Sequence, residues 1–334
     1  MRLVAAALVF YSHSYALLRL PEPWFLGTMS FGGLGVAIFF GISGYLVTIS
    51  FQRGQCNPVT FLSKRILRIF PALIVVSVAS AYLLGPIVTE LELPAYFSSR
   101  TLSYVYNNIF LCPQFDLPGV FLKNPHPVGV NGSLWTLPLE FVMYFMVAAF
   151  CIIPFPKVHQ WISLALTVGA AVLCHIIPMG KYIGYGSDFY QVLYHAPYFF
   201  VGSFLSYHSA WVKENGSRFV LPLCVMLLAL AGTPLIRIAA WLAIPCIVIF
   251  IGEKRNALAA FVEPLGDVSY GIYLWSFPMQ QTAILYLVPH IGPFPAMLTA
   301  ATAVLLLAKI SWVVVERPAL RLKQTMSTNQ SPVT

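Results

Sequence analysis

Stretches of about twenty apolar residues, separated by short polar segments, recur along almost the whole chain. A run of this length can cross the hydrocarbon core of a bilayer as one α-helix. The pattern predicts helices at residues 2–18, 31–51, 69–88, 133–153, 159–178, 189–208, 217–233, 235–252, 268–288 and 294–314. The expected fold class is therefore all-α, a polytopic membrane bundle of about ten transmembrane helices. The two helices around Thr233 and Pro234 could instead fuse, which would move the C-terminus to the other side.

Composition agrees with this pattern. The chain has 334 residues, of which 59% are hydrophobic and 9% charged, and its mean hydropathy is +0.79. These values exclude a soluble globular domain. The N-terminus lacks a small-residue cleavage site, so we expect the first helix to stay as a signal anchor. The six cysteines are scattered without a C-x-x-C pair, which argues against a zinc site and a disulfide framework. We also expect no other metal site and no permanently bound cofactor.

The positive charges predict the orientation. With the N-terminus inside, five basic residues fall on the outer side, at Arg19, Arg100, Lys123, Lys181 and Arg237, while Lys309 lies near the inner end of the last helix. The other thirteen fall on the inner side, at Arg2, Arg53, Lys64, Arg65, Arg68, Lys157, Lys213, Arg218, Lys254, Arg255, Arg317, Arg321 and Lys323. This bias predicts that both termini are cytoplasmic. It also explains the net charge of +8 without a nucleic-acid partner.

One outer connection is unusually long. Residues 89–132 contain five prolines with Tyr104, Tyr106 and Phe110 among them. Long connections are usually functional or disordered, and aromatic residues favour the membrane surface. We expect an ordered flap on the membrane interface that takes part in acceptor recognition. Residues 1–323 are then one transmembrane domain, and the polar residues 324–334 form a disordered cytoplasmic tail.

The first helix carries two ionisable residues in an apolar run. Arg2 and His13 are eleven residues apart, which places them on one helix face roughly 16 Å from each other. A lone buried histidine is often satisfied by a backbone group, but ionisable groups at membrane depth usually mark pathways or active sites. From this stretch alone, both interpretations of His13 stay open.

Two basic residues open the third helix. Arg65 and Arg68 are three positions apart and share a helix face, so both guanidinium groups can reach one phosphate group. The alternative is that basic residues at a cytoplasmic helix end follow the positive-inside rule and contact anionic lipid. Taken alone, the motif favours this alternative.

A carboxylate lies inside the fourth helix. Glu140 is about two turns from the outer end, where an unpaired charge is costly, so it should be protonated or have a partner. His13 is a sterically reasonable partner, because a carboxylate that orients an imidazole supports a general base. The alternative is a neutral Glu140 bonded to a backbone carbonyl.

Two further stretches have simpler interpretations. The glycines of Phe39–Tyr45 lack the lysine of a phosphate loop, which favours close helix packing through small residues. Asp267 precedes the ninth predicted helix and is a candidate for its N-cap.

The order of these motifs is more specific than any one of them. It comprises R-x10-H at Arg2 and His13, F-F-G-I-S-G-Y at 39–45, R-x-x-R at Arg65 and Arg68, N-G-S-L-W-T-L-x-x-E ending at Glu140, S-Y-G-I-Y-L-W at 269–275 and V-E-R-P at 315–318. This order resembles acyltransferase family 3, the integral membrane O-acyltransferases, from Arg2 to Pro318. The resemblance implies transfer of an acyl group, commonly acetyl from cytoplasmic acetyl-CoA, to a hydroxyl of a surface glycan or glycolipid.

The resemblance assigns roles to individual residues. It implies that R-x10-H places function on Arg2 and His13, and that R-x-x-R does so on Arg65 and Arg68. Two departures stand out. Many relatives have histidine where this chain has Ser276, so the role of that histidine does not transfer. Relatives also have several residues before the motif arginine, whereas Arg2 directly follows the first methionine.

These observations combine into one expected mechanism. Acetyl-CoA or another acyl-CoA enters from the cytoplasm with its phosphates on Arg65, Arg68 and Arg2, and His13, oriented by Glu140, is the general base on the acceptor hydroxyl. We expect a multi-pass protein of a bacterial inner membrane, with an acceptor sugar and an oligomeric state left open. The rival functions are a proton-coupled transporter or flippase, with His13 and Glu140 as a proton relay, and a non-catalytic scaffold.

Overall fold

Helices dominate the chain. A computed structural model of the protein describes residues 1–54, 57–127, 129–153, 155–254 and 266–328, so that Cys56 and Arg255 lie outside these ranges. The only strands in the described ranges form two antiparallel hairpins, β1 (Trp24–Phe25) with β2 (Met29–Ser30) and β3 (Ile183–Gly184) with β4 (Ser187–Asp188). The predicted all-α class is therefore confirmed.

Helical segments occupy each of the ten predicted windows. They are α1 (Arg2–Ala16), α2 (Phe31–Arg53), α3 (Pro58–Ala79) with η1 (Ser80–Leu84) and α4 (Gly85–Val88), η2 (Gly132–Trp135) with α7 (Thr136–Ala149) and η3 (Phe150–Ile152), α8 (Pro156–Ile176), α9 (Phe189–Tyr207), α11 (Ser217–Ala229), α12 (Ile236–Gly252), α14 (Ser269–Tyr286) and α16 (Pro293–Ser311). The other helical segments of the described residues are α5 (Leu93–Tyr96), α6 (Ser99–Ile109), α10 (Ser209–Asn215), α15 (Val288–Ile291), η5 (Trp312–Glu316) and α17 (Arg317–Thr328).

Within the described residues, five helices are long and apolar enough to cross a membrane by themselves. They are Phe31–Arg53, Pro58–Val88, Gly132–Ile152, Pro156–Ile176 and Pro293–Leu322. The chain is thus a helical membrane protein. The number of ten spans and the cytoplasmic side of both termini stay predictions.

The helix boundaries decide one alternative left open by the sequence and correct one expectation. The possible fusion around Thr233 and Pro234 is wrong, because α11 ends at Ala229 and Gly232 turns the chain with a φ of +77° before α12. Glycine adopts this left-handed backbone without steric cost. The third helix begins at Pro58 rather than at residue 69, so Arg65 and Arg68 lie inside the helix and not before it.

The chain forms two compact units. The first comprises Met1–Val9, Pro23–Leu62 and Pro138–Pro264, and the second comprises Phe10–Glu22, Ser63–Leu137 and Leu265–Thr334. The start of α1 and Glu140 belong to the first unit. His13 and the two arginines of α3 belong to the second.

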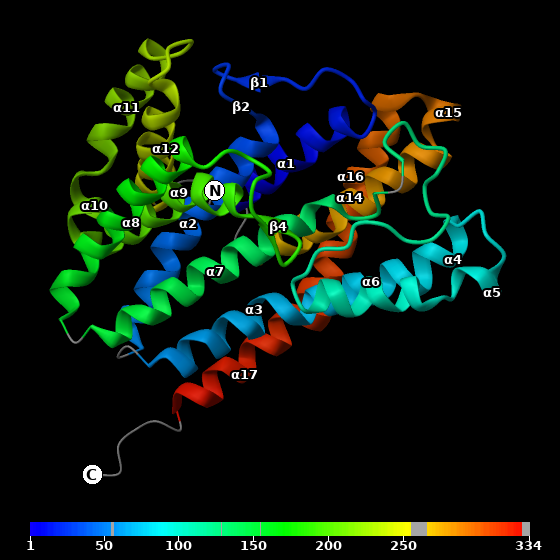
Figure 1. Ribbon diagram of the computed structural model, residues 1–334, viewed down its shortest axis with the longest axis horizontal. Coiled ribbons are helices and arrows are strands. Elements are labelled where there is room, and N and C mark those ends of the chain that lie inside the picture. Colours follow the sequence, from blue (N-terminus) through cyan, green and yellow to red (C-terminus); the bar gives the residue numbers. More distant parts are fainter. Residues whose placement is uncertain (55–56, 128, 154, 255–265, 329–334) are drawn as a thin grey trace. The chain divides into compact units, whose positions relative to one another are not determined.

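In the first unit, α2, α9 and α12 pack against one another, and α8 packs on α9 (Figure 1). Glycines permit the closest of these contacts. A Cβ on Gly44 of α2 would lie 1.8 Å from the carbonyl oxygen of Phe199, and a Cβ on Gly202 of α9 would lie 2.2 Å from that of Gly41. The prediction that the glycines at 39–45 serve close helix packing is therefore confirmed.

We expect the Gly44→Ala variant to lose about 3 kcal/mol of stability, because the added methyl group cannot fit against the Phe199 carbonyl without separating the helices. The measurement is thermal unfolding of purified protein in detergent. Gly169→Ala is the matched control, since a Cβ on Gly169 of α8 would meet nothing within 4 Å. Unfolding of both variants at the wild-type temperature would contradict the prediction.

In the second unit, α14 and α16 lie side by side (Figure 1). One buried cluster joins α1, α14 and α16 through residues that include Leu17, Phe277 and Met297. The close contact again involves a glycine, since a Cβ on Gly271 would lie 2.9 Å from Cα of Ala308. Helix α14 is thus the central support of this unit.

The long outer connection is ordered, as predicted, over its described residues 89–127 and 129–132. Tyr96 of α5 and Tyr104 of α6 are fully buried in a cluster with Leu117, Val120 and Phe121. Burial raises the pKa of both phenols, so they stay neutral and contribute packing. The connection is therefore a small folded layer rather than a loose loop, while its placement on the membrane interface stays a prediction.

Candidate functional site

His13 lies near the end of α1, with Arg2 at the opposite end of the same helix. The helical rise places the two residues about 16 Å apart along the axis. Both side chains are partly buried. The structure therefore preserves the spacing on which the R-x10-H interpretation depends.

Hydrogen bonds from α14 and to Glu22 hold the residues on both sides of His13. The amide Nε2 of Gln280 donates to the carbonyl oxygen of Phe10 at 2.9 Å and to Oγ of Ser14 at 2.8 Å. On the preceding residue, Oγ of Ser12 donates to Glu22 Oε2 at 2.5 Å. Gln280 is fully buried, where such hydrogen bonds are costly to lose. The position of His13 is thus held by its immediate neighbours.

The imidazole of His13 contacts the ring of Phe277. The ring centroids are 5.3 Å apart and the planes are at 77°, an edge-to-face arrangement. Phe277 lies one turn before Gln280 on α14, so one face of that helix supplies both contacts to α1. Nδ1 of His13 is buried and has no hydrogen-bond partner among the described residues. An imidazole in this setting is suited to act as a base toward a substrate group.

Arg68 is the centre of an ion cluster in the second unit. Its guanidinium group lies 2.6 Å from Asp267 Oδ2 and 3.3 Å from Glu316 Oε2. The Glu316 side chain is 1% exposed and also accepts a hydrogen bond from Ser311 at 3.0 Å. Arg68 therefore balances two carboxylates, one of which is fully buried.

Aromatic rings surround this cluster. The guanidinium carbon of Arg68 lies 5.6 Å from the ring centre of Tyr270 and 6.0 Å from that of Trp312. The Tyr270 hydroxyl donates to the carbonyl oxygen of Ile69 at 3.0 Å. The π-helical segment η5 carries both Trp312 and Glu316, and such segments are frequent at functional sites. The cluster ties α3 to the start of α14 and to η5.

The expected N-cap role of Asp267 is wrong. Helix α14 begins at Ser269 with Val268 at the N-cap position, and Ser269 Oγ donates to Asp267 Oδ1 at 2.7 Å. The other oxygen of this carboxylate binds Arg68. A charge-assisted bond to a distant arginine has replaced the local cap.

Arg65 lies one turn before Arg68 on α3 and is partly buried. The two arginines share a helix face, as their spacing predicts. Arg68 already binds two carboxylates, so a phosphate that reached it would share the guanidinium group with them.

Glu140 lies in α7, in the first unit. Its Oε1 accepts a hydrogen bond from Ser43 of α2 at 2.7 Å and another from Tyr144, one turn along α7. The hydroxyls of Ser43 and Tyr144 are also 3.1 Å apart. Glu140 thus has the partners expected of a carboxyl group at this depth. Its pairing with His13 stays a prediction.

The segment before α7 is bonded to α14 in the second unit. Asn131 Nδ2 donates to the carbonyl oxygen of Leu274 at 2.9 Å, and the Tyr273 hydroxyl donates to that of Ser133 at 2.5 Å. Ser276 donates to the carbonyl oxygen of Ile272 at 2.6 Å and is 1% exposed. Its hydroxyl is therefore satisfied within its own helix.

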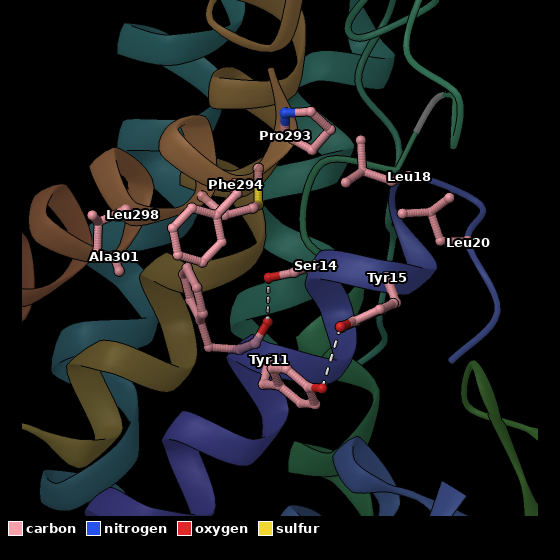
Figure 2. A pocket seen from close by; sticks show the side chains of 11 residues that line it. Tyr11, Ser14, Tyr15, Leu18, Leu20, Pro293, Phe294, Leu298 and Ala301 are labelled. Carbon is pink, nitrogen blue, oxygen red and sulfur yellow. Dashed lines mark hydrogen bonds between the residues drawn. The ribbon is translucent and has the colours of Figure 1, made fainter. Parts of the chain in front are cut away.

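Figure 2 shows an apolar groove between α1 and α16 with a volume of about 390 Å³. Its lining includes Tyr11, Ser14 and Tyr15 from α1, and Phe294 and Leu298 from α16. The residues of α1 that line the groove lie on one side of the helix, and the centre of that side is roughly 130° around the helix axis from His13. The groove is therefore not the site at His13.

Sequence reasoning missed the polar residues that hold α1 and the outer connection to α14. Gln280 and Gln281 are both fully buried and make the hydrogen bonds to these segments. A signal was present, because two adjacent amides inside a predicted membrane helix are costly unless they have partners. His126 was also missed, since a single histidine in a connection carries no pattern.

Comparisons with known proteins are consistent over nearly the whole chain. The profile of a family described as acyltransferase domain matches residues 1–314. An O-acetyl transferase of Shigella phage Sf6 is 32% identical, over 95% of this chain and 93% of that protein. Nodulation protein 10 of Rhizobium leguminosarum bv. viciae is 28% identical, over 98% of this chain and 93% of that protein. The exopolysaccharide production protein ExoZ of Rhizobium meliloti is 26% identical, over 87% of this chain and 90% of that protein. No solved structure matches the chain with statistical significance.

Proposed function

Because this chain belongs to the acyltransferase family matched over residues 1–314, and is therefore an acyltransferase, we propose that it moves an acetyl group from cytoplasmic acetyl-CoA to a hydroxyl of a surface polysaccharide or glycolipid. The observation that carries this proposal is the family match together with the O-acetyl transferase relative. The name of the exopolysaccharide production protein supports a polysaccharide acceptor. We place the protein in a bacterial inner membrane.

His13 is the proposed general base. The acceptor oxygen attacks the thioester carbonyl carbon while an imidazole nitrogen of His13 takes the hydroxyl proton. The carbon–sulfur bond then breaks, and the imidazolium returns the proton to the leaving thiolate, so that the products are an ester and free coenzyme A. General base catalysis of this kind contributes about 10²–10⁴-fold to the rate. The buried Nδ1 and the bonded neighbours of His13 support this role.

Three arginines have proposed roles on the donor side. Arg65 binds the phosphates of acetyl-CoA directly, because a guanidinium group can bind a phosphate with two hydrogen bonds. Arg68, which already carries Asp267 and Glu316, holds the helix that presents Arg65. The R-x10-H spacing supports Arg2 as a further contact to acetyl-CoA. The sequence motif that ends at Glu140 supports its role in orienting His13.

The direct test uses purified protein in detergent, acetyl-CoA labelled in the acetyl group, and surface polysaccharide from cells that lack the gene. We expect the label to become ester-linked to the polysaccharide while an equal amount of free thiol appears. One control replaces the protein with boiled protein. The other treats the labelled polysaccharide with mild alkali, which should release an ester-linked label. Labelled thioester that stays intact would favour a transporter or flippase and would overturn the proposal.

A further inference from the structure

A second histidine lies close to the first, on a different segment of the chain. His126 belongs to the long outer connection, and its ring centroid lies 6.3 Å from that of Phe277 with the planes at 76°. His13 contacts the same phenyl ring at 5.3 Å. All three residues belong to the second unit. Two imidazoles therefore flank one aromatic ring, with His126 exposed and His13 partly buried.

The backbone that carries His126 is fixed to α14. Gln281 Nε2 donates to the carbonyl oxygens of His126 at 2.9 Å and Gly129 at 2.7 Å. Asn124 Nδ2 in turn donates to Gln281 Oε1 at 2.8 Å and to the Gln281 carbonyl oxygen at 2.9 Å. Gln281 is fully buried and Asn124 is 6% exposed. A satisfied, buried amide network of this kind rigidifies the segment that it joins.

Glycines bring the same segment close to Phe277. A Cβ added to Gly132 would lie 2.5 Å from Cε2 of Phe277, and one added to Gly129 would lie 3.6 Å from Cε1 of the same ring. The Cβ on Gly129 would also lie 3.5 Å from Nε2 of His126. The outer connection therefore packs directly on Phe277, and His126 is a fixed part of the surroundings of His13.

We propose that His126 binds the acceptor, by a hydrogen bond from its imidazole to a hydroxyl of the sugar whose neighbouring hydroxyl His13 deprotonates. This inference rests on the proposed function. A neutral imidazole has one donor and one acceptor nitrogen, which suits a sugar hydroxyl that both donates and accepts. Its exposure allows a polysaccharide to reach it from solvent, and its fixed backbone limits the entropy lost on binding. The ligand class is a polyhydroxylated sugar.

The test compares the acetylation kinetics of the wild type, His126→Ala and His126→Gln, with labelled acetyl-CoA and the deacetylated surface polysaccharide as substrates. We expect His126→Ala to raise the KM for polysaccharide about three- to tenfold, as for the loss of one hydrogen bond. The KM for acetyl-CoA and the slow hydrolysis of acetyl-CoA without acceptor should not change. His126→Gln should recover part of the loss, because its amide also donates and accepts hydrogen bonds.

His290→Ala is the matched control, since His290 is another exposed histidine and lies in α15, just after the C-terminal end of α14. Its KM for polysaccharide should equal that of the wild type. An unchanged polysaccharide KM in His126→Ala, or a rise in the KM for acetyl-CoA of the same size, overturns the role of His126 alone. Failure of the wild-type protein to label polysaccharide overturns the proposed function, and this inference with it.

Discussion

Alanine in place of His13 is expected to reduce acetyl transfer by about 10²–10⁴-fold, the usual contribution of a positioned general base. The acceptor hydroxyl would then have to attack the thioester without a group to take its proton. His13→Gln should lose as much, because an amide keeps the polarity of the site but does not accept a proton at neutral pH. The measurement is the initial rate of labelled ester formation at saturating acetyl-CoA.

A loss of folding must be separated from a loss of chemistry. His195→Ala is the matched control, because His195 is a buried histidine of α9 that bonds the carbonyl oxygen of Gln191 within its own helix at 2.8 Å. We expect this variant to keep most of the wild-type rate, and both His13 variants to unfold within a few degrees of the wild type. Turnover by His13→Ala within about twofold of the wild type would remove His13 from the mechanism.

The apolar pattern was sufficient to find the helices, because about twenty apolar residues have few other stable conformations in a membrane protein. It failed at the start of α3, which begins at Pro58 instead of residue 69. Lys64, Arg65 and Arg68 interrupt the apolar run there, so a search for apolar windows begins after them. Their charges do not break the helix, since lysine and arginine are good helix formers.

The ion cluster could not be derived from the sequence, although the sequence draws attention to Arg68 and Asp267 individually and Glu316 lies in the V-E-R-P motif. Arg68 and Glu316 are 248 positions apart, and pairing over such a separation depends on how the helices pack. Asp267 was assigned by a local rule to a helix cap, but a bond to a distant guanidinium group is stronger than a cap. Local rules therefore identified the residues and missed the partners.

The position of His126 shows a second reason for incomplete prediction. The long connection contains one amphipathic helix, α6, but the described residues after it, which include His126, form no helix whose hydrophobic period would fix their path. Their fold follows from contacts such as those of Gln281. By contrast, the relation of Arg2 to His13 needed only the geometry of one helix. Sites built along one element are predictable from spacing, whereas sites assembled from connections are not.

We expect Arg68→Gln to destabilise the protein by about 3–5 kcal/mol, because it leaves the buried Glu316 carboxylate without its cation. The double variant Arg68→Gln/Glu316→Gln removes both charges and should recover a large part of this loss, which a double-mutant cycle would measure as coupling. Arg100→Gln is the control, since the Arg100 side chain is 62% exposed in its pair with Asp116 and should contribute less than about 1 kcal/mol. Thermal unfolding in detergent of the wild type, these three variants and Glu316→Gln, the single variant that completes the cycle, gives the values.

The same series separates structure from donor binding on α3. Arg65→Gln should raise the KM for acetyl-CoA about tenfold or more at an almost unchanged unfolding temperature, since the loss of a charge-assisted phosphate contact affects binding more than folding. The double variant Arg68→Gln/Glu316→Gln should show the opposite pattern. Its unfolding temperature should be lower than that of the wild type, while the folded protein binds acetyl-CoA almost normally. If Arg68→Gln instead unfolds like the wild type and loses acetyl-CoA binding, then Arg68 is itself a phosphate ligand. Asp267 and Glu316 would then hold a guanidinium group that the donor has to share.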